Sequence, residues 1–240
     1  MLNLCRLGII AVTLLALVAV SGCGSGSQMM SPTPASTANV RVLVGSASAG
    51  AVTVQVDGAT VKNLAYPQDS GYMQVKIGSQ MAVQVPGFGP NPMGVPTGNF
   101  APGSNHTFMV DGWGTFGMSS MLLNDDMTAA PNGGVKLRIM VAAKMTGLND
   151  VYIMPAGSLP SGTPTLSNIA LNSVSSYQAL PAGSYDVFVT AAGAPASVVF
   201  QAPTLALTAG QNRTLVLVND CTATTCGVNP FKTITLADLM

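Results

Sequence analysis

Short runs of alternating apolar and polar residues recur along the chain from residue 39 onward. In the first run, Val40, Val42 and Val44 alternate with Arg41 and Leu43. Alternation with a period of two, broken by glycine-containing turns, is typical of a half-buried antiparallel β-strand. We expect further strands in the first part of the chain at residues 52–56, 72–77, 81–85, 107–110 and 118–123.

The stretch 180–191, LPAGSYDVFVTA, shows the pattern most clearly. A tight turn at residues 181–183 precedes Tyr185, Val187 and Val189, which share one face of an extended chain. A turn of this kind followed by a strand predicts the entry of a β-hairpin.

The same order of patterns occurs twice. VRVLVGSA at 40–47 resembles VKLRIMVAA at 135–143, and VTVQVDG at 52–58 resembles DVYIMPAG at 150–157. Three further pairs of segments match in the same order, namely 70–72 with 175–177, 102–107 with 209–214, and 123–125 with 236–238. Shared landmarks at a spacing of about a hundred residues indicate an internal duplication.

We therefore predict an all-β protein with two tandem antiparallel β-sandwich domains of the immunoglobulin or transthyretin type. The first domain spans residues 39–128, a linker spans 129–134, and the second domain spans 135–240. The composition agrees with this fold class, because the chain has no Glu and is rich in Val, Thr, Ser and Gly. Nine basic residues balance nine Asp, so nucleic-acid binding is not expected.

The first 22 residues resemble a bacterial lipoprotein signal peptide. An uncharged apolar run at 7–20 follows Arg6 and leads into Val20-Ser21-Gly22-Cys23, which resembles a lipobox. The alternatives are an ordinary secretory signal or a short membrane span, but a spanning helix needs about 20 apolar residues. The resemblance implies cleavage before Cys23 and lipid attachment to its sulfur.

The next segment, 23–38, has the composition of a flexible tether, with a reach of about 20 Å. Gly24 is not the Asp that commonly retains such proteins in the inner membrane. The resemblance therefore implies a protein of the bacterial cell envelope, lipid-anchored at the outer membrane.

Two cysteines remain in the predicted folded part, Cys221 and Cys226 in CTATTC. Outside the cytosol a disulfide is the favoured state of such a pair. A free dithiol and a two-thiolate metal site are the alternatives, although zinc usually takes four ligands.

No set of residues in the sequence indicates catalysis. His106 is the one histidine, and we expect it to be a solvent-facing strand residue. Asp125 and Asp126 are neighbours, which point to opposite faces of a strand and so do not form an acid–base pair. Fourteen methionines could hold copper, but Met also fills gaps in apolar cores. We predict no catalytic residues, no metal and no cofactor.

The segment between Val85 and Asn105 is a loop rich in Gly and Pro that keeps several apolar residues. It either folds back to cover its own sheet or exposes Phe88, Met93 and Phe100 to a partner.

Motifs of both copies resemble a known family. The opening VRV…VTVQVDG, the centre SSYQALPAGSYDVFVT and the close LTAGQNRTLVLV are similar to the bacterial domain of unknown function 4397 family. The resemblance implies β-sandwich repeats in secreted or lipid-anchored proteins and brings no catalytic residues. We expect a non-enzymatic protein that binds an envelope protein or glycan, or has a structural role. The alternative is an envelope hydrolase or a metal-handling protein that uses His106 and the methionines.

Overall fold

The computed structural model describes residues 36–239, apart from residues 88, 90, 113–116, 144–147, 171 and 223–224. The side chains of residues 221–222 and 225–230 also lie outside this description. The predicted signal peptide, Cys23 and Phe88 therefore fall outside the described residues. Within the described part, no helix is long and apolar enough to cross a membrane.

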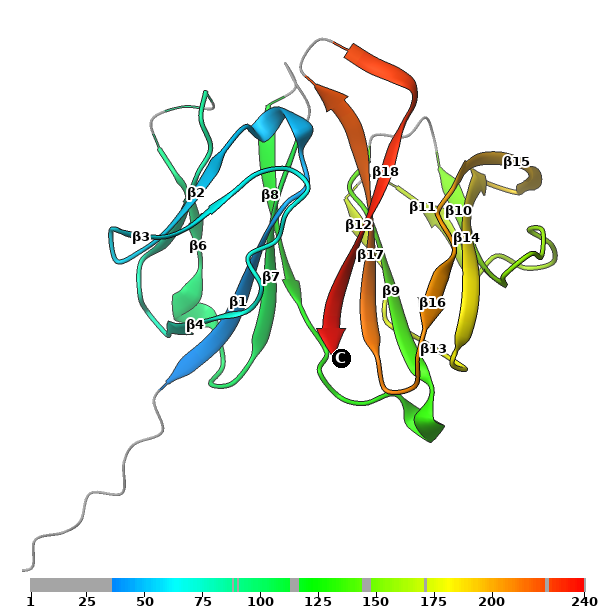
Figure 1. Cartoon of the computed structure of the whole chain (residues 1–240), viewed down its shortest axis with the longest axis horizontal. Helices are drawn as coiled ribbons and strands as arrows, with labels where there is room; N and C mark the ends of the chain where they lie inside the picture. Colours follow the sequence, from blue (N-terminus) through cyan, green and yellow to red (C-terminus); the bar gives the residue numbers. More distant parts are fainter. Residues whose placement is uncertain are drawn as a thin grey trace, which may run out of the picture. The chain divides into compact units, whose positions relative to one another are not determined.

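The first half of the described chain, residues 37–124, forms two four-stranded sheets (Figure 1). Sheet A has the order β4 (Met73–Lys76), β1 (Thr37–Val44), β7 (Asn105–Gly112), β8 (Met118–Asn124). Sheet B has the order β3 (Ala59–Leu64), β2 (Val52–Val56), β5 (Met81–Gln84), β6 (Met93–Val95). Their facing apolar side chains, such as Val42 and Val83, form the first core.

The second half, residues 135–239, also forms two sheets. In sheet C, β12 (Ser173–Val174) and β13 (Gln178–Leu180) both pair with β9 (Val135–Val141), which is followed by β17 (Asn212–Thr222) and β18 (Thr225–Leu239). In sheet D, the order is β11 (Leu166–Ile169), β10 (Asn149–Pro155), β14 (Gly183–Ala191), β15 (Ala194–Gln201), and β16 (Leu205–Leu207) also pairs with β14. Short 3₁₀ helices occur at Ala47–Ala49, Thr97–Asn99 and Pro131–Gly133.

The strand order of the two halves corresponds. Sheet A has a central parallel pair, β1 with β7, and sheet C has the equivalent parallel pair, β9 with β17. In each case an antiparallel strand, β8 or β18, closes the same side of the sheet. In both halves, connections such as β1 to β2 and β9 to β10 cross from one layer to the other, as in a β-sandwich.

The turn at 181–183 is not the turn of a β-hairpin, although the strand that follows it, β14, forms a hairpin with β15. Before the turn, β13 pairs with β9 in sheet C, whereas β14 after the turn pairs with β10 in sheet D. The turn thus joins two layers, and the hydroxyl of Tyr185 donates a hydrogen bond to the carbonyl oxygen of Pro181 over 2.7 Å. Tyr185, Val187 and Val189 share the buried face that their spacing predicted.

Sheets A and C also bury their other faces, because they pack against each other. Leu43 and Met109 of sheet A meet Met140 and Val216 of sheet C in a central core. The order of layers is therefore B, A, C, D, which can be followed from left to right in Figure 1. Strand β1 is consequently buried on both faces, although its alternating sequence is typical of a half-buried strand.

Candidate functional site

Eight polar side chains meet at the contact between sheets A and C, and we call them the charge cluster. Each half contributes one Arg, one Tyr, one Thr and one Asp. The members are Arg41, Tyr72, Thr107 and Asp125 of the first half and Arg138, Tyr177, Thr214 and Asp238 of the second. Both guanidinium groups and both carboxylates are buried.

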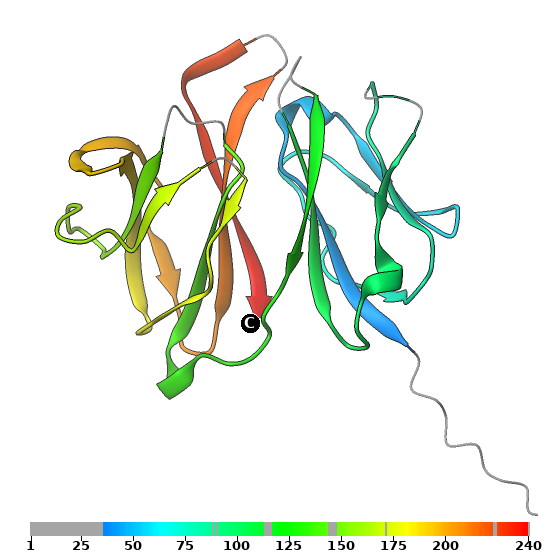
Figure 2. The same cartoon turned by 180° about the vertical axis from the view of Figure 1, so that it is seen from behind.

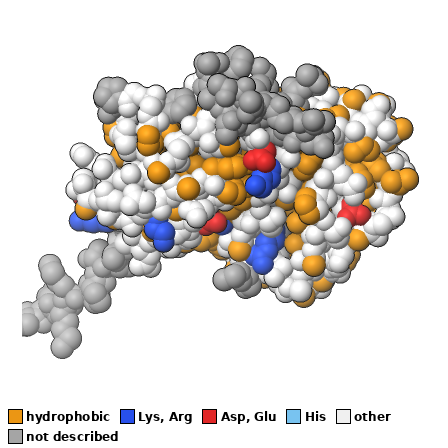
Figure 3. Space-filling view, turned by 45° about the horizontal axis from the view of Figure 1, so that its top comes forward, with side chains coloured by type: hydrophobic (Ala, Val, Ile, Leu, Met, Phe, Trp, Pro, Cys, Tyr) orange, Lys and Arg blue, Asp and Glu red, His pale blue; other side chains and the backbone are white. Residues whose placement is uncertain are grey.

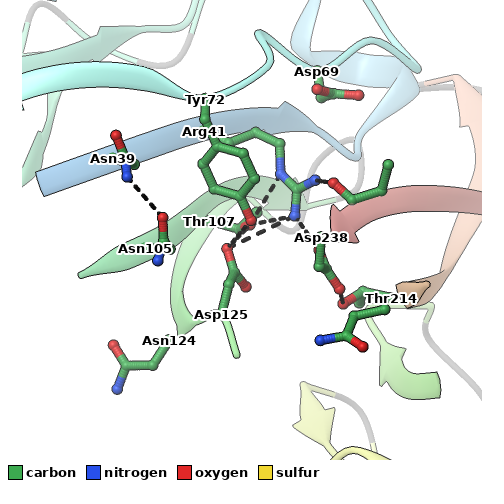
Figure 4. Close-up of polar contacts among 12 residues, drawn as sticks. Asn39, Arg41, Asp69, Tyr72, Asn105, Thr107, Asn124, Asp125, Thr214 and Asp238 are labelled. Carbon is green, nitrogen blue, oxygen red and sulfur yellow. Dashed lines mark hydrogen bonds and ion pairs between the residues drawn. The ribbon is translucent and has the colours of Figure 1, made fainter. Parts of the chain in front are cut away.

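Arg41 extends from β1 to the end of β18 (Figure 4). Its Nη2 donates to Oδ1 of Asp238 over 2.6 Å, and its Nη1 donates to the carbonyl oxygen of Ala237 over 2.9 Å. Nε and Nη2 also donate to Oγ1 of Thr107 on the neighbouring strand, over 3.1 and 2.8 Å. Asp125 lies 3.7 Å from the same Nη2.

Arg138 makes the reciprocal contacts from β9 to the end of β8. Its Nη2 donates to Oδ1 of Asp125 over 2.5 Å, and its Nη1 donates to the carbonyl oxygen of Asn124 over 2.8 Å. Nε donates to Oγ1 of Thr214 over 3.0 Å. Each arginine therefore bonds to the carboxylate of the other half, which is the exchange expected of an interface with local two-fold symmetry.

The other carboxylate oxygen of Asp125 accepts hydrogen bonds from its own half. Oδ2 accepts from the hydroxyl of Thr107 over 2.6 Å and from the hydroxyl of Tyr72 over 2.7 Å. The Tyr72 ring also lies 4.6 Å from the guanidinium carbon of Arg41, within cation–π distance. Burial, together with the negative charge of Asp125, raises the pKa of Tyr72 above its usual range, so the hydroxyl remains a neutral donor.

Asp238 is bonded in the same way. Its Oδ2 accepts from Thr214 over 2.6 Å and from Tyr177 over 2.9 Å, and the Tyr177 ring lies 4.6 Å from the guanidinium carbon of Arg138. Burial and the negative charge of Asp238 raise the pKa of Tyr177. With two cations facing two anions and every Asp oxygen bonded, the cluster holds the halves together and offers no open position for a substrate.

An ion pair at the edge of the cluster fixes the segment between the halves. Nζ of Lys136 donates to Oδ2 of Asp126 and to Oγ1 of Thr128, each over 2.6 Å. Partial burial opposes ionisation of Asp126, but these bonds outweigh it and lower the pKa of this carboxyl to about 2. Nδ2 of Asn212 donates to the carbonyl oxygens of Asp126 and Thr128 over 2.7 and 2.8 Å.

An open groove of about 560 Å³ lies beside this ion pair. Its lining consists of residues 121–124 of β8, Asp126, Lys136 and Arg138 of β9, and residues 174–177. In Figure 2, β8 is the green strand of the first half that lies next to the second half.

The prediction that His106 faces solvent is wrong. His106 shares the face of β7 that carries Phe108 and Val110 into the first core, and it is 6% exposed. Its ring stacks on Phe100 with 3.8 Å between centroids, and its Nε2 lies 2.7 Å from Oγ of Ser104. Burial lowers the pKa of His106, which favours the neutral ring.

The structure places two of the three proposed partner-contact residues against the first core. Phe100 is 7% exposed and Met93 is partly buried, whereas Phe88 lies outside the described residues. Met93 begins β6 and Phe100 directly follows the 3₁₀ helix at Thr97–Asn99, so the predicted loop contains regular structure. The burial of both residues fits a segment that covers its own sheet. A partner contact in this loop stays a prediction.

The cysteine pair is described only through its backbone. Cys221 of β17 lies directly opposite Cys226 of β18 in the strand register, and both side chains lie outside the described residues. Directly opposed residues of antiparallel strands have Cα atoms about 4.5–5.5 Å apart, a separation that a disulfide bridges. The disulfide stays a prediction.

The methionines that were considered for copper do not gather at one place. Met81 and Met118 pack in or against the first core, whereas Met109 and Met121 belong to the central core. Within the described part of the chain, no three His, Cys, Asp or Glu side chains lie close enough together to hold a metal ion.

Sequence reasoning missed both arginines of the cluster, although a signal was present. Arg41 and Arg138 each interrupt an apolar strand of their half, and Tyr72, Tyr177, Asp125 and Asp238 lie in matched segments. A charge at corresponding positions of two apolar strands indicates a buried partner.

None of the curated proteins compared with the chain matches it significantly. Among solved structures, the crystal structure of "a putative cell adhesion protein" from Bacteroides eggerthii DSM 20697 aligns with 85% of this chain and 95% of its own, at 8% identity and a TM-score of 0.20. This similarity is too low to carry an argument about fold or role.

The family comparison is informative. A match that begins in β1 and ends in β10 confirms the resemblance that the sequence motifs indicated. Residues 38–152 match the family described as "Domain of unknown function (DUF4397)", so this part of the chain carries a domain of that family.

Proposed function

We propose that this protein is a non-enzymatic component of the bacterial cell envelope, anchored through lipid on Cys23, whose two halves present a surface for a partner. The observation that carries the proposal is the reciprocal bonding of the charge cluster. Arg41 and Arg138 each bond to the carboxylate of the other half, and an apolar core surrounds them. Two halves held in this way form a rigid binding unit.

The non-enzymatic role is supported by the way in which the described polar side chains are used. The carboxylates of the charge cluster accept bonds at both oxygens, and His106 is covered by Phe100. A nucleophile or general base needs access to a substrate, which these groups lack.

Anchoring at the outer membrane is supported by the lipobox-like sequence before Cys23 and by Gly24 after it. The tether leads directly to β1, which begins at Thr37 and lies at the centre of sheet A. Two or three acyl chains provide a stable anchor, whereas a single chain binds a membrane only marginally.

The chain is low in charge, with nine Lys and Arg and nine Asp. On the face drawn in Figure 3, Lys, Arg and Asp side chains are scattered, and small apolar patches lie among polar groups. Such a surface favours a partner recognised through hydrogen bonds and apolar contacts, such as an uncharged protein segment or a glycan.

The anchoring is tested by replacing the predicted lipid-bearing cysteine. Cys23→Ala should abolish labelling by radioactive palmitate and move the protein from the membrane fraction to the soluble fraction. Cys5→Ala, which removes a cysteine within the predicted signal peptide, is the matched control and should keep both properties. Unchanged palmitate labelling and membrane fractionation of the Cys23 variant would refute the anchor.

A further inference from the structure

Strand β8 forms an open edge of sheet A, because it pairs with β7 on one side only. The N–H of Asp125, which directly follows β8, donates to the carbonyl oxygen of Asn105 over 2.8 Å. In an antiparallel pair, residues that face the partner strand alternate with residues that face away. The backbone N–H and C=O groups of Ser120, Leu122 and Asn124 therefore point outward from the sheet. The Asn124 carbonyl confirms the direction, since Arg138 donates to it.

This edge lacks the features that usually prevent strand addition. Natural sheets protect their edges with charged side chains, bulges, prolines or very short strands. The other described edge strands longer than four residues have such features, because β3 carries Lys62, β18 carries Lys232, and the pairing of β15 is interrupted by register shifts. In contrast, the sequence of β8, MSSMLLN, is uncharged, and its pairing with β7 has no register shift.

The groove described above lies along the same edge. Met121 and Leu123 line it on the β8 side, and Val174, which is 37% exposed, lines it on the other. Lys136 lies in the groove but is already bonded to Asp126 and Thr128. The groove therefore combines free backbone hydrogen-bonding groups and apolar side chains with charged groups, Asp126, Lys136 and Arg138, that are already paired.

We propose that the β8 edge and this groove bind an extended, uncharged peptide segment of a partner protein by β-strand addition. An extended peptide backbone presents donors and acceptors at the spacing that Ser120 and Leu122 require, and apolar residues at alternate positions would contact Met121 and Val174. A second copy of this chain is the less suitable occupant, because residues 174–177 lie across the groove from β8 and would obstruct the approach of a whole sheet. This proposal rests on the binding role that we proposed above and names the site at which the partner binds.

The probe is a fluorescein-labelled seven-residue peptide of alternating Val and Thr, blocked at both ends and titrated into the purified protein. We expect saturable binding by fluorescence anisotropy, together with hydrogen-exchange protection of the Ser120 and Leu122 amides. A peptide with the same sequence but N-methylated at alternate residues should not bind, since it cannot complete the ladder.

Ser120→Pro removes one outward N–H at an edge position where proline is tolerated. This variant should weaken binding about tenfold, whereas Ser120→Thr, which keeps the N–H, should bind as the wild type does. If the Ser120→Pro variant does not fold, Val174→Asp on the opposite side of the groove replaces it and should also weaken binding.

Three results would overturn the proposal. The first is that the Val–Thr peptide does not bind at millimolar concentration. The second is that the Ser120→Pro or Val174→Asp variant binds the peptide as well as the wild type does. The third is a concentration-dependent dimer in sedimentation that Ser120→Pro abolishes, because this dimer would make a second copy the occupant. The experiment involves neither Cys23 nor a membrane, so its failure is distinct from a failure of the anchoring test.

Discussion

The two halves of the molecule agree closely where they touch and differ at the positions around that contact. Arg, Tyr, Thr and Asp occupy corresponding places in both halves of the charge cluster, with nearly equal hydrogen-bond lengths. Outside the cluster, Asn39 and Lys136 hold equivalent register positions, but only Lys136 fixes the connecting segment. The contact face tolerates little change, because each buried charge depends on a partner in the other half.

Removing either arginine tests whether the two halves contribute equally to the stability of the charge cluster. Arg41→Met leaves Asp238 without its closest cation, and Arg138→Met does the same to Asp125. Breaking a buried pair from one side costs about 3–5 kcal/mol, so each variant should lower the free energy of unfolding by this amount. Denaturant unfolding measures the effect. A loss in only one of the two variants would show that the halves are not energetically equivalent.

A smaller effect is expected at Asp111, whose equivalent in the second half is Val218. Burial, which outweighs a hydrogen bond from the Gly112 N–H, raises the pKa of Asp111 from 3.8 to about 6. The folded state therefore retains a proton that the unfolded state releases, and stability falls as pH rises from about 4 to 6. Asp111→Val should remove this fall and stabilise the protein at pH 7 by about 2–3 kcal/mol.

The measurement for Asp111 is thermal or denaturant unfolding of both proteins at several pH values between 4 and 7. The variant and the wild type should differ most at pH 7. A constant difference across this range would contradict a buried, titrating carboxyl.

The smallest expected effect concerns the cysteines, which have no counterpart in β7 and β8. A disulfide between Cys221 and Cys226 closes a short loop and should contribute about 2 kcal/mol. The unreduced, denatured protein should therefore take up no alkylating reagent at these positions, and reduction should lower the unfolding midpoint. Alkylation of both thiols without reduction would refute the disulfide.

Much of the fold was predictable from alternation, but the alternation pattern does not identify what lies against each face. The all-β class and strands such as β2, β5 and β9 were predicted close to their observed bounds. Strand β3 was missed because five of its six residues are exposed, so it shows no buried face. Arg41 was assigned to a polar face, but in the structure this face meets a further sheet rather than water.

Part of the charge cluster could be recognised from the sequence, because some of its residues lie in segments that match between the two halves. Tyr72 and Asp125 were recognised as landmarks of the repeated pattern, but their spacing gave no indication that they share a cluster with residues of the other half. Contacts of this kind depend on how whole sheets pack, which a single sequence does not show. The position of His106 was mispredicted for a related reason, since its neighbour Phe100 comes from a segment rich in Gly and Pro whose packing the sequence pattern did not indicate.

The bond between Arg41 and Asp238 joins residues 197 positions apart, so it links one of the first strands of the folded part to the last. Contacts between such distant residues form late in folding, because a long loop must be closed before they stabilise the chain. Arg41 therefore remains without its closest carboxylate until β18 has been added to sheet C. A chain that is truncated before residue 238 would bury an incompletely paired cation and be open to proteolysis. In this way the cluster makes stability of the first half conditional on a complete second half.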